Sequence, residues 1–275
     1  TASNGRIIEI PMAGKSPISP KKNVYLLAAL MIGIALPVSI IYIRDLMRYK
    51  IENRKDVEKL CNLPILAEVP LGNKQGSVRG AIVIHENRNN LMEEAFRSLR
   101  TNLLFMLKPE DKVIMITSSQ PSDGKSFVAG NLAVSMAYLG KRVIIIGLDI
   151  RKAGLDKVFG LDSHTPGITN YLTQPDDSDW KEWILPSEIS PNLDIFPRGN
   201  IPPNPTELVS RSKLDELIRQ LKEEYDYVIL DTAPIAMVTD TSIISRVADL
   251  CVYVCRADHT PKAAFQFIHT LKEQT

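Results

Sequence analysis

Residues Lys112–Ser126 read KVIMITSSQPSDGKS, and this stretch decides the fold that we expect for the chain. An apolar run, Val113 to Ile116, feeds a turn-rich loop that closes on Gly124–Ser126, after which a helical pattern begins at once. In such a strand–loop–helix unit, backbone N–H groups of the loop and the first helical turn point at bound phosphate, and the helix dipole favours the anion. The stretch therefore predicts a phosphate-binding site.

The loop follows the P-loop pattern G-x-x-x-x-G-K-[S/T], except that Ser119 occupies the first glycine position. Gly124 lets the backbone approach the phosphates, Lys125 places a charge on the β- and γ-phosphates, and the Ser126 hydroxyl can hold Mg²⁺. Taken alone, the pattern is also compatible with an ordinary turn between a strand and a helix. The residues expected to contact the nucleotide are Ser122, Asp123, Gly124, Lys125, Ser126 and Phe127.

Two downstream aspartates follow apolar runs and support a site for Mg²⁺ and ATP. Asp149 comes after a second apolar run, and Asp231 ends the Walker B-like run Tyr227–Asp231. Ligands of open α/β sheets bind outside the carboxyl ends of the strands, so both carboxylates can face the P-loop. We expect Lys125, Asp149 and Asp231 to be catalytic, and Ser126, Asp149 and Asp231 to hold Mg²⁺. For Asp149, a turn or helix-cap aspartate is the alternative.

The chain alternates apolar strands with amphipathic helices, which predicts an α/β fold with a doubly wound parallel sheet of the P-loop NTPase type. We expect a helix that begins at Thr206, a possible N-cap, and ends near Glu224, and a short strand at Leu66–Val69. The three cysteines lack zinc-ligand spacing and the four histidines are isolated. A net charge of +1 gives no indication of a nucleic-acid partner.

One transmembrane helix is predicted ahead of this domain. Val24–Ile43 contains twenty uncharged residues, which at about 1.5 Å each span about 30 Å, the hydrocarbon thickness of a bilayer. A buried core helix is the alternative. Basic residues are more frequent after this segment than before it, which points to a cytoplasmic C-terminal side, and the P-loop favours the same side because ATP is cytosolic. The basic run is either a solvated helix face or a surface that touches anionic headgroups. The basic residues that follow the segment are Arg44, Arg48, Lys50, Arg54 and Lys55.

These features divide the chain into four expected parts. Residues 1–23, with Pro11, Pro17 and Pro20, form an extracytoplasmic lead-in, and residues 24–43 form the transmembrane helix. Residues 44–84 form a juxtamembrane helix, from Arg44 to Leu63, and a linker, and residues 85–275 form the P-loop domain. We expect the chain to be a fragment of a longer protein of the inner membrane, with its P-loop domain in the cytoplasm.

A charged ridge is expected on the helix from Asn90 to Met106, where Glu94, Arg97 and Arg100 fall three residues apart. Residues at this spacing lie on one side of a helix. The ridge is either a solvent-exposed face with an internal ion pair, or a surface that pairs with a neighbouring subunit.

The combination of these motifs resembles the bacterial tyrosine kinases, in particular the cytoplasmic kinase part of capsule or exopolysaccharide co-polymerases with its second transmembrane helix. The shared features are a proline-bearing segment before the span, the E-x-x-R-x-x-R ridge at Glu94–Arg100, the P-loop, the acid at Asp231, and a G-x-x-P-P-N-P-x-E-L segment at Gly199–Leu208. The resemblance extends over the chain from about Pro11 onward.

The resemblance implies ATP-dependent tyrosine autophosphorylation in trans, with Mg²⁺, within a homo-oligomeric ring such as an octamer. It assigns ATP binding to Lys125 and Ser126, the Walker B role to Asp231, and ring assembly to Glu94, Arg97 and Arg100. It further implies a cognate tyrosine phosphatase and the polysaccharide polymerase and export proteins as partners.

Two departures from the family pattern leave alternatives open. The family motif apolar-D-x-D-x-R has its first acid replaced by Gly147 here, so that Asp149 alone remains. The family's cluster of C-terminal tyrosines does not occur before Thr275. One alternative is a catalytically weak ATP-binding scaffold of the same machinery. Another is an ATPase of the septum-positioning or plasmid-partition type, which the membrane span and the arginine ridge disfavour.

Overall fold

The computed structural model describes residues 21–46, 49–71, 81–85, 90–162, 164–236, 239–265 and 268. Its internal contacts divide the chain into two units, Thr1–Tyr49 and Lys50–Thr275, which we describe separately. The proline-bearing lead-in expected at residues 1–23 lies outside the described residues, apart from its last three positions.

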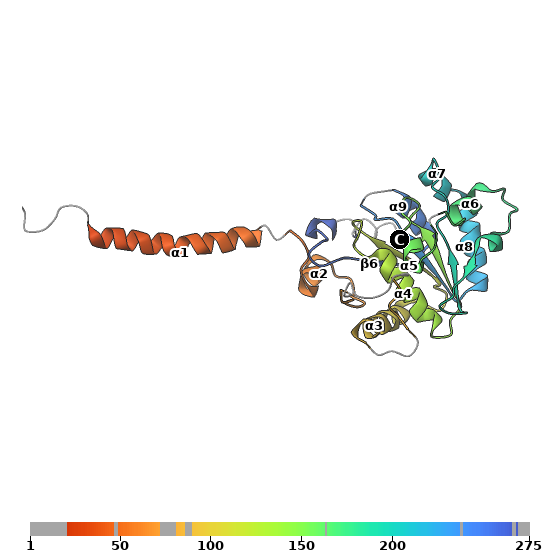
Figure 1. The fold of residues 1–275 in the computed structure, drawn as a ribbon, viewed down its shortest axis with the longest axis horizontal. Helices are drawn as coiled ribbons and strands as arrows, with labels where there is room; N and C mark the ends of the chain where they lie inside the picture. The colour runs from red at the N-terminus through yellow and green to blue at the C-terminus, as the bar shows by residue number, and fades with distance from the viewer. Residues whose placement is uncertain are drawn as a thin grey trace, which may run out of the picture. The chain divides into compact units, whose positions relative to one another are not determined.

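The first unit contains one long helix, α1 (Lys22–Leu46), drawn in red in Figure 1. Its segment Lys22–Arg44 is long and apolar enough to cross a membrane by length and composition. The apolar side chains described in this segment are exposed.

The second unit is built on a sheet that, within the described residues, has the strand order β3-β4-β2-β5-β1-β6. Every pair of neighbouring strands is parallel except β3–β4, which is antiparallel. The expected parallel sheet is thus confirmed, with a short antiparallel strand added at one edge. The strands are β1 (Val113–Ser118), β2 (Val143–Leu148), β3 (Leu185–Pro186), β4 (Leu193–Phe196), β5 (Tyr227–Thr232) and β6 (Leu250–Val254).

Consecutive strand residues point to opposite sides of the sheet, so both of its faces carry apolar side chains. Helices cover both faces (Figure 1). Ile114 and Ile145 pack in one apolar core with α3 (Leu91–Met106) and α4 (Lys125–Ala137). Met115 and Ile144, their neighbours in sequence, pack in a second core with helices on the other face. Those helices are α6 (Ile168–Thr173), α7 (Pro205–Val209), α8 (Ser212–Glu224) and α9 (Asp240–Ile244).

The helix expected from Thr206 to Glu224 is two helices. Asn204 is the residue before α7, Pro205 is its first residue, and Thr206 lies inside it, so the prediction of Thr206 as N-cap is wrong. The chain breaks at Arg211, whose ψ of 144° is extended, and α8 begins at Ser212. Proline suits the first position of a helix because its missing N–H has no intrahelical acceptor there.

The juxtamembrane region also differs from the expected single helix, since α1 ends at Leu46 and a separate α2 spans Arg54–Leu60. Asn53 caps α2: its side chain accepts a hydrogen bond from the Asp56 backbone N–H at 3.2 Å. The strand expected at Leu66–Val69 is not found, because this segment has no strand pairing in the described structure. The remaining elements are α5 (Gly154–Phe159) and the 3₁₀ helices η1 (Trp180–Trp183), η2 (Ser245–Val247) and η3 (Lys262–Phe265).

Candidate nucleotide-binding site

The loop from β1 to α4 is shaped by two residues with positive φ, Ser122 at 70° and Gly124 at 100°. Lys125 begins α4, and the first bond of the helix runs from the Val128 N–H to the Gly124 carbonyl at 2.9 Å. Among the described residues, no protein acceptor is found for the backbone N–H groups from Asp123 to Ser126. Unpaired donors at a helix N-terminus form a ready anion site, so this loop can hold phosphate oxygens.

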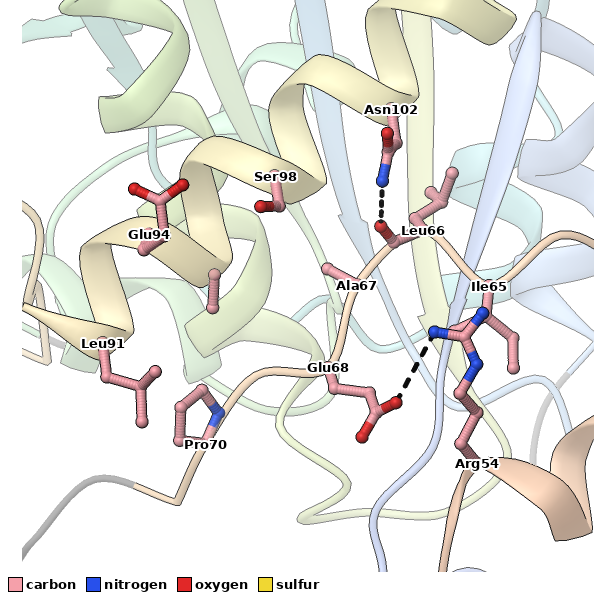
Figure 2. Close-up of a pocket in the computed structure, with 11 residues that line it drawn as sticks. Arg54, Ile65, Leu66, Ala67, Glu68, Pro70, Leu91, Glu94, Ser98 and Asn102 are labelled. Atoms are coloured by element: carbon pink, nitrogen blue, oxygen red, sulfur yellow. Dashed lines mark hydrogen bonds and ion pairs between the residues drawn. The ribbon is translucent and has the colours of Figure 1, made fainter.

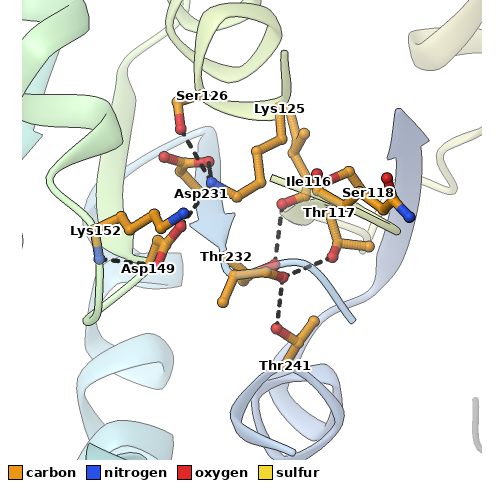
Figure 3. Close-up of polar contacts among 12 residues, drawn as sticks. Ile116, Thr117, Ser118, Lys125, Ser126, Asp149, Lys152, Asp231, Thr232 and Thr241 are labelled. Carbon is orange, nitrogen blue, oxygen red and sulfur yellow. Dashed lines mark hydrogen bonds and ion pairs between the residues drawn. The ribbon is translucent and has the colours of Figure 1, made fainter. Parts of the chain in front are cut away.

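Four polar side chains meet at the carboxyl edge of the sheet (Figure 3). The Lys125 ammonium lies 2.7 Å from Oδ2 of Asp149, 4.0 Å from Oδ1 of Asp231 and 3.3 Å from the Ser126 hydroxyl. Lys125 and Ser126 begin α4, Asp149 follows β2, and Asp231 lies in β5, the neighbour of β2. The structure thus brings together the four side chains expected to be catalytic or metal-binding.

The charged side chains of this cluster are buried, and burial shifts the pKa values of Lys125 and Asp231. The side chains of Lys125, Asp149 and Asp231 are only 11%, 4% and 1% exposed. Burial raises the pKa of Asp231 to about 6; Lys125 and Ser126 oppose the shift, and Asp149 adds to it. Burial lowers the pKa of Lys125, but the attraction of Asp231 and Asp149 outweighs it and leaves that pKa above its ordinary value. Lys125 therefore stays an ammonium ion, as phosphate binding requires.

The oxygen ligands of this cluster fit Mg²⁺. Both carboxylate oxygens of Asp231 are buried without a hydrogen-bond donor of good geometry, although the Ser126 hydroxyl lies close by. A buried carboxylate in this condition is costly unless a cation joins it. The described residues contain no group of three or more His, Cys, Asp or Glu side chains that could hold a metal ion. The ion would therefore take its remaining ligands from phosphate and water, as Mg²⁺ commonly does.

Threonine hydroxyls fix the strand ends that carry the site, as Figure 3 shows. Thr232 donates to the Ile116 carbonyl at 3.0 Å, which ties β5 to β1 beside Asp231. Thr117 and Thr241 both donate to the Ala233 carbonyl, at 2.9 and 2.7 Å. These buried bonds hold the backbone after Asp231 in one position, so its carboxylate stays aimed at the P-loop.

Gly154, the first residue of α5, is a member of the site that sequence reasoning missed. A Cβ built there would collide with the Ser126 hydroxyl and lie 3.8 Å from Oδ2 of Asp231. Only glycine lets α5 approach this close to the expected Mg²⁺ ligands. No local sequence signal marks the residue, because its role comes from a contact with a different helix.

Not every residue expected to contact the nucleotide presents its side chain to the site. The Asp123 carboxylate is fully buried and points to Thr260 and His259, so only its backbone can serve the phosphates. The Phe127 ring packs edge-on against Phe96, with centroids 5.8 Å apart. Ser122 offers its carbonyl to the Arg256 guanidinium at 3.1 Å.

Gly147 lies against the backbone of Arg198. It lies in β2, opposite Asp231 in the strand register. A Cβ at this position would approach the Arg198 backbone nitrogen to 3.0 Å and its Cα to 3.3 Å. An aspartate at position 147 would therefore require the Arg198 backbone to move.

The charged ridge on α3 is split by the structure. Arg97 pairs with Glu94 at 2.9 Å on the exposed side of the helix, as the solvent-face interpretation expected. Arg100 instead donates to the Ser135 carbonyl at 2.6 Å and so links α3 to α4. The three side chains therefore do not form one free surface.

Beside the ridge, α3 and the segment 65–70 enclose a surface hollow (Figure 2). Asn102 of α3 donates to the Leu66 carbonyl at 2.7 Å, and Arg54 of α2 pairs with Glu68 at 3.7 Å. None of the P-loop residues lines this hollow. These contacts attach the segment 65–70 to α3 and to α2.

Comparisons with known proteins show which sequences and folds this chain resembles. Residues 111–274 match the family model described as AAA domain. A "Putative tyrosine-protein kinase in cps region" from Klebsiella pneumoniae is 35% identical over 274 residues, which cover 94% of this chain and 37% of that protein. The chain thus spans little more than a third of the length of this relative.

Two solved kinase domains have the same fold. The "BceF Tyrosine Kinase Domain" is 30% identical, with a TM-score of 0.72 over 82% of this chain and 94% of that one. "The kinase domain of Escherichia coli tyrosine kinase ETK" is 26% identical, with a TM-score of 0.73 over 82% of this chain and 90% of that one. The fold and the family model together imply that this chain binds a nucleotide such as ATP.

Proposed function

Because the chain belongs to the AAA-domain family and, within it, to the bacterial tyrosine kinases, we propose that it transfers the γ-phosphoryl group of ATP to tyrosine. The observation that carries this proposal is the buried cluster of Lys125, Asp149 and Asp231, in which the ammonium lies 2.7 Å from one carboxylate and 4.0 Å from the other. One cation beside two acids at the end of a P-loop is suited to charge neutralisation during phosphoryl transfer.

Each residue of the cluster has a distinct proposed role. Lys125 and the loop N–H groups hold the β- and γ-phosphates, and Ser126 and Asp231 hold Mg²⁺, with Asp149 next to it. When bound, Mg²⁺ supplies positive charge that neutralises the phosphate oxygens. Asp149 also orients the tyrosine hydroxyl or accepts its proton. The pKa of a free aspartate is low for a base acting on a phenol, but a loose transition state requires little help from a base.

The proposal extends to the setting of the reaction. α1 anchors the kinase domain in the inner membrane with the domain on the cytoplasmic side, where ATP is present. Subunits phosphorylate one another in a ring, in which Glu94 and Arg97 contact a neighbouring subunit. This activity regulates the polymerisation and export of a capsular or exopolysaccharide, and a cognate phosphatase reverses it. The polysaccharide setting is supported by the names of curated relatives, such as the kinase in a cps region, and the membrane anchor by the length and composition of α1.

The test uses the full-length protein in detergent, incubated with labelled ATP and analysed for phosphotyrosine. We expect the wild type and the control Lys157→Met, which changes an exposed lysine of α5, to be labelled, and Lys125→Met to be unlabelled. A Lys125→Met chain of different size should become labelled when it is mixed with wild type, since the reaction occurs in trans. Labelling of Lys125→Met on its own would refute the assignment.

A second candidate function is an ATP-binding scaffold without kinase activity. The specific observation in its favour is that glycine occupies position 147, so Asp149 is the acid that remains of the family motif. The Arg198 backbone lies where a side chain at position 147 would be. A scaffold would bind ATP with the same dependence on Lys125 but form no phosphotyrosine. The labelling experiment therefore separates the two functions.

A further inference from the structure

The carboxylate of Asp123 lies inside the P-loop, yet it is turned away from the phosphate site and fully buried. Its Oδ2 accepts hydrogen bonds from the Gln120 backbone N–H at 2.9 Å and the Ser119 hydroxyl at 3.2 Å. Its Oδ1 accepts from the Thr260 hydroxyl at 2.7 Å and lies 2.9 Å from Nδ1 of His259. A charge in a phosphate-binding loop would repel the substrate, so its burial behind these polar groups has a physical reason.

The partners of this carboxylate come from two distant parts of the chain. Ser119 and Gln120 belong to the P-loop itself, so their bonds close the loop into a compact turn. Thr260 and His259 follow β6 and are separated from Asp123 by well over a hundred residues. Asp123 therefore joins the loop to a second, independent support.

That support is a rigid turn between Arg256 and Thr260. The Thr260 hydroxyl accepts from the Arg256 backbone N–H at 2.8 Å while it donates to Asp123, and the Thr260 N–H donates to the Arg256 carbonyl at 2.9 Å. The Thr260 carbonyl accepts from the Ile51 N–H, and Ile51 is buried in a small apolar cluster with Phe265. Thr260 itself is fully buried, so its hydroxyl has a fixed direction.

The same turn contacts the loop at a second point, where the loop is strained. The Arg256 guanidinium donates to the carbonyl of Ser122, whose φ of 70° is unfavourable for a residue with a side chain. Such a conformation persists only where surrounding contacts hold it. Ser122 and Asp123 directly precede Gly124, so the turn acts on the part of the loop whose N–H groups face phosphate.

From these contacts we propose that Asp123 is a positioning residue for nucleotide binding, and that Thr260 acts through it. The bonds to Thr260 and His259 hold the P-loop in the shape that binds phosphate before the nucleotide arrives. Preorganised donors gain affinity because no ordering cost remains at the binding step. The inference rests on the proposed function only in that ATP is the nucleotide.

The test compares Thr260→Val, Thr260→Ser and wild type by equilibrium titration with a fluorescent ATP analogue and Mg²⁺. Valine keeps the shape of threonine but lacks the hydroxyl, so we expect the nucleotide Kd to rise about tenfold, as for the loss of a hydrogen bond to a charged group. Serine keeps the hydroxyl and should bind within about twofold of wild type. Thr173→Val, at an exposed threonine of α6, is the matched control.

A kinetic measurement separates positioning from general damage. In Thr260→Val the KM for ATP should rise about as much as the Kd, while kcat changes less than threefold, because the residue does not touch the reacting atoms. Asp123→Asn should raise the Kd at least as much as Thr260→Val, because it also disturbs the bonds from Ser119 and Gln120. The double variant should be no worse than Asp123→Asn alone, since Thr260 acts through Asp123. Equal affinity of Thr260→Val and wild type would overturn the inference. Failure of the wild type to bind the nucleotide would instead count against the proposed function.

Discussion

The Lys125 ammonium is paired with Oδ2 of Asp149 at 2.7 Å and lies further from Asp231, at 4.0 Å. Phosphate groups must therefore compete with Asp149 for the lysine on which their binding depends. In such an exchange the ammonium leaves one anion for another and stays paired, while the buried Asp149 carboxylate loses its partner. Under the proposed function, the pair would keep Asp149 close to the phosphate that Lys125 binds.

This relationship predicts opposite effects of Asp149→Asn on binding and on transfer. Without Mg²⁺, the variant should bind ATP as well as wild type or several-fold more tightly, because a competitor for Lys125 is gone. Autophosphorylation should fall about a hundredfold if Asp149 orients or deprotonates the acceptor. Fluorescent nucleotide titration and a labelling time course measure the two effects, with the exposed Asp162→Asn as control. Unchanged labelling would exclude this role for Asp149.

Gly154→Ala is predicted to weaken binding that depends on Mg²⁺. The added methyl group would collide with the Ser126 hydroxyl, so either Ser126 or α5 must move. Forcing a methyl group into a packed site costs about 1–3 kcal/mol, and we expect at least a tenfold higher Kd with Mg²⁺ and a smaller change with EDTA. Lys157→Ala in the same helix is the control. Equal losses with and without the ion would point to a general disturbance of α5.

The convergence of Lys125, Ser126, Asp149 and Asp231 follows from the sequence for a simple reason. Each acid stands at the end of an apolar run, and the carboxyl ends of neighbouring parallel strands share one edge of the sheet. The strand order places β2 and β5 next to each other, and β1 next to β5. Local patterns therefore predicted that these four side chains would converge.

Gly154 and Asp123 show where that reasoning stops. Glycine is required at position 154 because α5 packs there against Ser126. Asp123 is held by Thr260, which is distant in sequence but in direct contact with it. Neither contact has a sequence period or a spacing that could reveal it. The break between α7 and α8 is different, because Pro205 is a visible start signal and Arg211 has no comparable stop signal.

Asp249 predicts a pH-dependent contribution to stability. Burial opposes its ionisation, but the Lys112 and Val113 backbone N–H groups, each at 2.8 Å, and the Lys222 ammonium outweigh burial and hold its pKa below the ordinary value. A carboxyl group with a lowered folded-state pKa stabilises the fold above its unfolded-state pKa of about 3.9, and the effect disappears as the pH falls through the folded-state pKa.

Asp249→Asn should therefore lower the free energy of unfolding by up to about 1 kcal/mol at pH 7, since water screens part of the interaction, and by less once the pH has fallen through the folded-state pKa. Urea unfolding of the kinase domain, followed by circular dichroism at several pH values, measures this difference. The exposed Glu110→Gln serves as the control and should have little effect at either pH. A loss of the same size at every pH would show that shape rather than charge matters at this position.

The two arginines of the α3 ridge are predicted to respond differently to substitution. Arg100 donates to the Ser135 carbonyl at 2.6 Å, so Arg100→Ala removes a charged hydrogen bond between α3 and α4 and should destabilise the domain by about 1.5–3 kcal/mol. Arg97 has a half-exposed side chain and an ion pair with Glu94, and Arg97→Ala should change stability by less than about 1 kcal/mol.

If the exposed pair contacts a neighbouring subunit, Arg97→Ala should dissociate the ring of the full-length protein while leaving the fold intact. Mass measurement of the assembly in detergent, together with thermal unfolding, distinguishes these effects, and the charge-preserving Arg97→Lys should retain part of the assembly. The reverse pattern, with Arg97→Ala fully assembled and only Arg100→Ala dissociated, would mean that ring assembly depends on the α3–α4 packing. The exposed ridge would then be a solvent-facing surface.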